Sequence, residues 1–215
     1  MAEDEDGIPR LSSRDMPRGP AAKTAMEAYW RSLRAAGRLP RRRDVDPSRF
    51  EGALPHAFVL ERAAPGVARL RVAGQGLGAL LGVDARGLPL SAFFTPADRP
   101  SLRAWLDRCF DGPALVDLPV AAKRAFRPAL GGRLLLLPLL DVEGQVTRAL
   151  GGIFLDGAVG RARVQLGLVE DATTRCEPVG RVVPVAVAQN DGGRRGLAEA
   201  PRAHLRLVVD NGRRG

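Results

Sequence analysis

The sequence predicts an α+β fold built on an antiparallel sheet. The expected elements run in the order helix, two strands, several short helices and three strands, so helices and strands are segregated rather than alternating as βαβ units. The strands come in pairs joined by turns, Pro65-Gly66 in the first pair and Glu143-Gly144 in the last. With 45% hydrophobic residues and only 5% aromatic residues, the core must be aliphatic. A length of 215 residues suits one domain with extensions.

The N-terminal part contains one clear helix. Residues 1–18 are charged and contain Pro and Gly, and we expect them to be disordered. Residues 19–54 are interpreted as a helix followed by a connector, with the helix from Pro20 to Ala36 and a stop at Gly37. Its apolar residues recur at i, i+3, i+4 and i+7 and form a stripe that must be covered. They are Met26, Tyr29, Trp30 and Leu33.

We expect this stripe to form a homodimer interface, because an isologous contact buries two copies of an apolar patch at once. Packing of the helix within its own chain is the alternative. The connector carries three consecutive arginines, Arg41, Arg42 and Arg43. A solvated connector is the favoured interpretation, and contact with an anion is the alternative.

The core is predicted over residues 55–157. Two alternating strands come first, and a short helix that ends near Gly82 follows them. Thr95 can cap a later helix, whose apolar face is formed by Leu102, Trp105, Leu106, Cys109 and Phe110. The strands are expected at 56–63, 67–74, 114–124, 132–142 and 146–156. Residues 158–215 are interpreted as a loosely structured, partly disordered extension, in which 165–170, 181–188 and 205–211 are β-like.

The core sequence resembles a known family. RLRVAGQGLGALLGVDARGLPLSAFF (69–94) is similar to the passage from the second strand to the first short helices of PAS domains. RLLLLPLLDVEGQVTRALGGIFLD (133–156) is similar to their last two strands. The leader before the first strand, which ends in DP and LPH (46–47 and 54–56), resembles that of small stand-alone alphaproteobacterial PAS proteins. The resemblance covers about residues 26–156.

This resemblance implies a five-stranded antiparallel sheet with short helices on one face. It also implies a sensory or regulatory module that acts through protein–protein interaction, with an unknown output partner and usually without catalysis. A cavity between sheet and helices is then expected, and a filled core is favoured over a small apolar-ligand pocket there. The expected lining is Leu90, Phe93, Leu102, Trp105, Leu106, Leu135, Leu137 and Phe154.

The glycine-rich loop from Gly74 to Gly82 raises the alternative of a nucleotide-binding enzyme. A dinucleotide loop needs G-x-G-x-x-G before a helix that leads to a parallel strand. Here the first three glycines are spaced two residues apart, and a turn and another helix follow. The sequence also lacks a G-x-x-x-x-G-K-[ST] loop. We therefore predict a protein that is not an enzyme.

Charge and residue content restrict the other classes. The net charge of +9 raises the alternative of a nucleic-acid-binding regulator, but the excess is spread along the chain rather than gathered in a patch. The sequence shows no signal peptide and no membrane-length apolar run, so we expect a cytoplasmic protein. The resemblance implies that haem, if bound, would be held by a histidine of the helical segment. Residues 75–112 contain no histidine, so we do not expect haem. The residues around Cys109 do not match the reactive-cysteine motif of flavin-binding relatives, so we do not expect flavin. We also expect no metal site.

Overall fold

A computed structural model describes part of the chain. The described residues are 19–34, 37–124, 127–158, 163–169, 171 and 173–180. Residues 1–18 and the β-like segments at 181–188 and 205–211 lie outside them. The predicted core boundaries at 55–157 stay a prediction.

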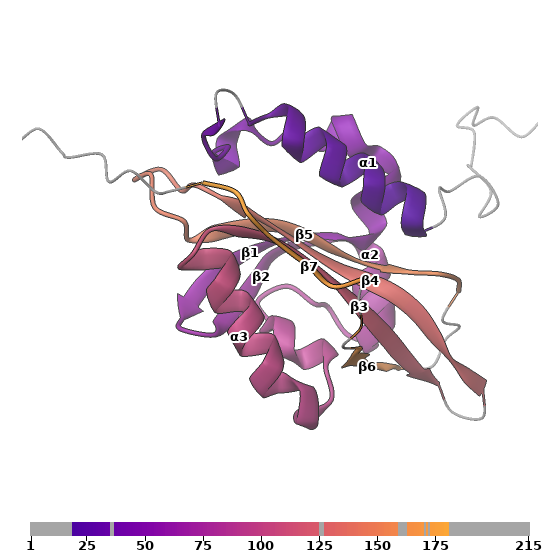
Figure 1. Ribbon diagram of the computed structural model, residues 1–215. Coiled ribbons are helices and arrows are strands. Elements are labelled where there is room, and N and C mark those ends of the chain that lie inside the picture. The colour runs from indigo at the N-terminus through magenta and orange to yellow at the C-terminus, as the bar shows by residue number, and fades with distance from the viewer. Residues whose placement is uncertain are drawn as a thin grey trace, which may run out of the picture. The chain divides into compact units, whose positions relative to one another are not determined.

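An antiparallel sheet forms the centre of the fold (Figure 1). Its strands follow one another in the spatial order β2-β1-β5-β4-β3-β6, and β7 also pairs with β3. The five strands from β1 to β5 are those predicted from the sequence, while β6 and β7 extend the sheet at the β3 edge. The strands are β1 Ala57–Ala64, β2 Val67–Ala73, β3 Ala114–Arg124, β4 Arg127–Leu139, β5 Arg148–Leu155, β6 Gln165–Leu168 and β7 Arg175–Pro178.

Both faces of the sheet are apolar, because its strands carry aliphatic side chains at successive positions. In β4, Leu134 and Leu136 belong to one core cluster, and the alternate residues Leu135, Leu137 and Leu139 belong to a second. Successive side chains of a strand point to opposite faces. The run of leucines therefore serves two cores, one on each side of the sheet.

One face of the sheet, which we call the inner face, is covered by short helices that lie between β2 and β3 in the sequence (Figure 1). The residues buried there form the inner cluster. Their apolar residues pack on the sheet, and Phe93 of η4 and Phe110 of α3 are buried in this cluster. Gly82 ends α2 with a φ of 73°, a left-handed conformation that favours glycine. The helices are α2 Gln75–Leu81, η4 Leu90–Phe93, η5 Pro96–Asp98 and α3 Arg99–Phe110.

The outer face is covered by the N-terminal segment. The helix α1, Gly19–Ser32, contacts β4 and β5, and the 3-10 helices η2, Arg42–Asp44, and η3, Pro47–His56, lead into β1 (Figure 1). Met26 and Trp30 are fully buried against the sheet, and the Trp30 indole N–H donates to the carbonyl oxygen of Pro138 at 3.2 Å. The N-terminal helix is thus part of the folded unit, and it ends before its predicted end at Ala36.

The α+β class and the PAS-like sheet are confirmed by this architecture. One local prediction needs correction. Trp105 lies on the expected helix, but its side chain is only partly buried at the margin of the inner cluster. The Arg108 guanidinium lies over its ring, 4.6 Å from the centroid, so a charged side chain rather than the core covers that face.

The two tryptophans provide a matched test of this fold. We expect Trp30→Ala to lower the free energy of unfolding by about 3–5 kcal/mol, because it empties a fully buried site under α1. Trp105→Ala is expected to cost only about 1–2 kcal/mol, because less of its surface is buried. Urea unfolding of both variants measures the difference. Equal losses would contradict the placement of α1 on the sheet.

Candidate functional site

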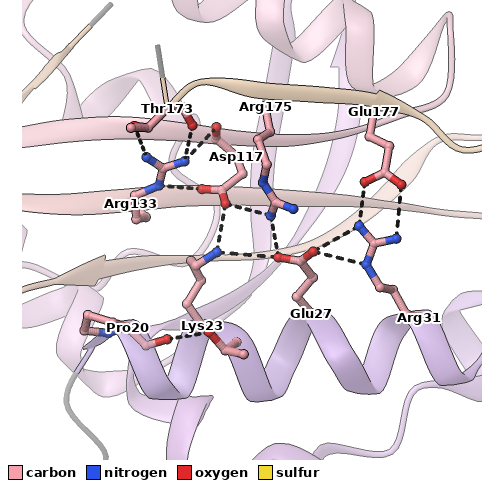
Figure 2. A network of polar contacts seen from close by, with 10 residues as sticks. Pro20, Lys23, Glu27, Arg31, Asp117, Arg133, Thr173, Arg175 and Glu177 are labelled. Atoms are coloured by element: carbon pink, nitrogen blue, oxygen red, sulfur yellow. Dashed lines mark hydrogen bonds and ion pairs between the residues drawn. The ribbon is translucent and has the colours of Figure 1, made fainter. Parts of the chain in front are cut away.

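A cluster of charged side chains lies between α1 and the outer face of the sheet (Figure 2). At its centre is Asp117 of β3, which is 1% exposed. Leu115 packs in the outer core and Asp117 lies two residues further along the same strand, so both side chains point to the outer face. A carboxylate at this depth requires cationic partners.

Three cations surround this carboxylate. Lys23 of α1 donates from Nζ at 2.8 Å, Arg133 of β4 from Nε at 2.7 Å, and Arg175 of β7 from Nη2 at 2.8 Å. Arg133 also donates from Nη1 to Thr173 Oγ1 at 2.7 Å and from Nη2 to the Thr173 carbonyl oxygen at 2.8 Å. One aspartate thus joins the N-terminal helix, the sheet and the last described strand.

Glu27 of α1 forms the second centre of the cluster. It is 9% exposed and accepts hydrogen bonds from Arg175 at 2.6 Å and from Arg31 Nε at 3.1 Å. Arg31 also binds both carboxylate oxygens of Glu177 on β7, at 3.1 and 2.5 Å. We call the seven residues the charged clamp: Lys23, Glu27, Arg31, Asp117, Arg133, Arg175 and Glu177.

The geometry of α1 explains why the clamp forms. Lys23, Glu27 and Arg31 are spaced four residues apart and therefore lie in one row on the helix. The apolar residues Met26 and Trp30 lie in the neighbouring row, so the helix presents an apolar row and a charged row to the sheet. The charged row is visible in the sequence, but its partners on β3, β4 and β7 are far away in the chain.

The electrostatics favour the ionised form of both central carboxylates. Burial alone raises the pKa of Asp117, but hydrogen bonds from Arg133, Lys23 and Arg175 outweigh it, and the pKa is lowered. The pKa of Glu27 is lowered in the same way, since hydrogen bonds from Arg175 and Arg31 outweigh burial. The clamp is held by mutual attraction among charges that would each be costly if left alone.

The structure divides the predicted pocket residues between the two faces. Leu90, Phe93, Leu102 and Leu106 are buried in the inner cluster, with Trp105 at its margin. The prediction was wrong for Leu135, Leu137 and Phe154. These three residues lie in the cluster on the outer face. A shift of one residue along a strand moves a side chain to the opposite face. The inward residues of β4 and β5 are instead Leu134, Leu136, Ile153 and Leu155.

The predicted dimer stripe also needs correction. Met26 and Trp30 are buried against their own sheet, and Tyr29 and Leu33 are partly buried against the same cluster. Tyr29 also accepts a hydrogen bond from the backbone N–H of Asp46 at 2.7 Å. The stripe therefore packs within the chain and is not a surface available to a second copy in this conformation.

The glycines of the Gly74–Gly82 loop have a packing role. A side chain at Gly74 would overlap the carbonyl oxygens of Leu54 and Pro55, and one at Gly76 would overlap that of Pro55. These glycines let α2 approach the backbone of η3 closely. The close contact explains these glycines by packing, and the nucleotide-binding alternative stays a hypothesis.

Other chemistry is sparse in the described residues. Cys109 is buried, and burial raises the pKa of its thiol. Within the described ranges, no group of three His, Cys, Asp or Glu residues is placed to hold a metal ion. None of the helices there has the length and hydropathy that a membrane span requires. The sequence arguments against haem and flavin stay predictions.

Comparison with known proteins supports the architecture. A family model described as PAS domain matches residues 18–154, and a search of curated proteins finds no match. One similar solved structure concerns a light-oxygen-voltage domain and a flavin analogue, with 19% identity, a TM-score of 0.38, and coverage of 51% of this chain and 83% of that chain. Another is an RNA-binding light-oxygen-voltage receptor, with 18% identity, a TM-score of 0.36, and coverage of 70% and 36%. At these values, neither likeness carries an argument about what this chain binds.

Removal of the central charge should destabilise the protein. We expect Asp117→Asn to lower the free energy of unfolding by about 3–5 kcal/mol, because it leaves three cations without their shared carboxylate. Asp111→Asn is the control, since Asp111 pairs with Arg62 at an exposed position and should cost about 1 kcal/mol or less. Urea unfolding at neutral pH compares the two. A cost for Asp117→Asn no greater than that of the control would show that the clamp does not hold the fold.

The clamp should also give the protein an acid-sensitive stability. Because the pKa values of Asp117 and Glu27 are lowered on folding, the folded state binds fewer protons than the unfolded state near these values. Their contribution is complete above the unfolded pKa values of about 4 and is lost as pH falls through the lower folded values. Urea unfolding from neutral pH to about pH 2 should show this loss. In Asp117→Asn the free energy of unfolding should fall less steeply as the pH is lowered. An unchanged pH dependence would contradict the assignment of this acid sensitivity to Asp117.

Proposed function

The chain belongs to the PAS domain family, and from this premise we propose that it is a non-catalytic regulatory module that signals to another protein by releasing α1. The observation that carries the proposal is the charged clamp. It joins α1, which precedes the core, to β7, which follows it, through one buried carboxylate on β3. A signal that weakens this junction acts on both flanks of the core at once.

The clamp suits a reversible contact. Its charged groups can be hydrated when α1 leaves, which offsets part of the attraction that they lose. Release of α1 would uncover Met26, Trp30 and the outer leucines of β4, which together form an apolar surface of the kind that binds proteins. The partner at this surface is another protein or a second copy of this chain.

In this proposal the inner core is a rigid scaffold that binds no ligand. Phe93 and Leu102 fill the space between sheet and helices, with at most 1% of either side chain exposed. A small apolar ligand in that space would have to displace such side chains. We therefore assign the output to the outer face and no ligand to the inner core.

Hydrogen exchange tests whether the clamp controls α1. Arg175→Gln removes one of the two cations that bridge Glu27 and Asp117, the other being Lys23, and it leaves Lys23 and Arg133 on Asp117. We expect amides of residues 19–32 to exchange faster in this variant, while those of β4 and β5 stay protected. Arg62→Gln is the matched control, because Arg62 also bridges two carboxylates, Asp107 and Asp111, away from the clamp. Equal exchange in α1 in both variants would contradict the proposal.

A second experiment concerns the output itself. We compare the intact wild-type chain, Arg175→Gln and Arg62→Gln in two measurements. The first quantifies the proteins that each form binds from a cell extract, and the second gives the oligomeric state of each form. A partner or self-association enhanced only in Arg175→Gln supports release as the signal. Micromolar binding of ATP or NAD that is lost in Gly76→Val would instead support the nucleotide-binding enzyme.

A further inference from the structure

A second feature of the outer face lies beyond the part covered by α1. It is a groove of about 220 Å³, bounded by the η2 and η3 segment on one side and by β1, β2 and β5 on the other. Its floor is an aliphatic row, because Val59 of β1 pairs with both Val72 of β2 and Leu150 of β5. Three neighbouring strands thus present one continuous apolar strip.

The groove is open at the edge of the sheet. Val72 is 49% exposed, whereas Val59 and Leu150 are buried. Phe50 and Leu54 of η3 form part of the facing wall. The strip is therefore covered at one end and accessible to solvent at the β2 end, as an apolar ligand entering from the edge requires.

A cation lines this apolar groove. The backbone N–H of Arg42 donates to the carbonyl oxygen of Leu140 at 2.8 Å, which fixes the residue beside the sheet. Arg41 donates to the carbonyl oxygens of Asp141 and Val142, and Arg43 pairs with Asp44. Among the residues that the structure describes, no carboxylate forms an ion pair with Arg42. An apolar groove with Arg42 in its lining fits a ligand that is apolar along its length and anionic at one end.

We propose that this groove binds a medium-chain carboxylic acid as a free small molecule. The hydrocarbon chain lies on Val59, Val72 and Leu150, and the carboxylate binds the guanidinium of Arg42. A volume of about 220 Å³ holds about seven heavy atoms at roughly 30 Å³ each, the space one water molecule takes in the liquid. A chain of about that length matches octanoate, with its carboxylate at the rim.

This site is separate from the charged clamp. It uses residues of η2, η3, β1, β2 and β5, none of which belongs to the clamp. It therefore goes beyond the proposed function and can be tested independently of it.

The test is a titration of the intact chain, with its Val and Leu methyl groups labelled for NMR, against octanoate at concentrations below micelle formation. We expect saturable shifts of the methyl groups of Val59, Val72 and Leu150. Arg42→Gln should weaken octanoate binding by at least about tenfold, as expected for loss of a charge-assisted hydrogen bond. Its affinity for 1-octanol, which lacks the charge, should not change. Arg49→Gln, an exposed neighbour outside the groove, should leave both affinities unchanged.

A second pair of variants tests the apolar floor without disturbing a buried site. Val72→Asp places a negative charge in the groove and should abolish binding of octanoate and octanol alike. Val169→Asp is the control, because Val169 is 39% exposed, follows β6 and does not line the groove. Absence of saturable shifts in the wild type, shifts centred on Leu90 and Leu102 of the inner core, or equal affinity for octanol and octanoate would each overturn the proposal.

Discussion

The buried carboxylate of Asp117 is the interaction on which the arrangement of the outer face depends. A charge at that depth is stable only when cations approach it, and the three that do so come from α1, β4 and β7. Each of these elements is therefore fixed relative to β3 by the same group. The second carboxylate, Glu27, repeats the arrangement one turn along α1 and connects it to β7 through Arg175.

The two faces of the sheet are stabilised in different ways. The inner face is an aliphatic and aromatic core that includes Phe93, Leu102 and Leu136, and none of the charged residues that the structure describes is buried in it. The outer face combines an apolar row under α1 with a charged row beside it. Apolar packing is insensitive to pH, whereas the charged row depends on ionised carboxylates. In the proposed function the inner core keeps its structure, whereas the outer face changes when a signal weakens the charged clamp.

The outer face is also divided along its length. α1 packs over β4 and β5, and the connector through η2 and η3 borders a groove over β1 and β2. The connector arginines have different roles as a result, since Arg41 and Arg43 contact neighbouring groups while Arg42 lines the groove. Contact of the connector with an anion therefore stays a proposal, and it concerns Arg42 alone.

The sequence by itself determined the class of fold, the five main strands, the helices between them and the PAS resemblance, because hydrophobic period, turn residues and caps are local properties. It did not determine which face each strand residue takes. The leucine run of β4 is apolar at every position, so no alternation identified Leu135 and Leu137 as outward-facing. The row Lys23, Glu27 and Arg31 was present in the sequence, but only pairing of β7 with β3 brought Arg175 to Asp117. The clamp was decided by tertiary structure, because its carboxylates and cations are separated by up to 148 residues and meet only when both flanks pack on one sheet.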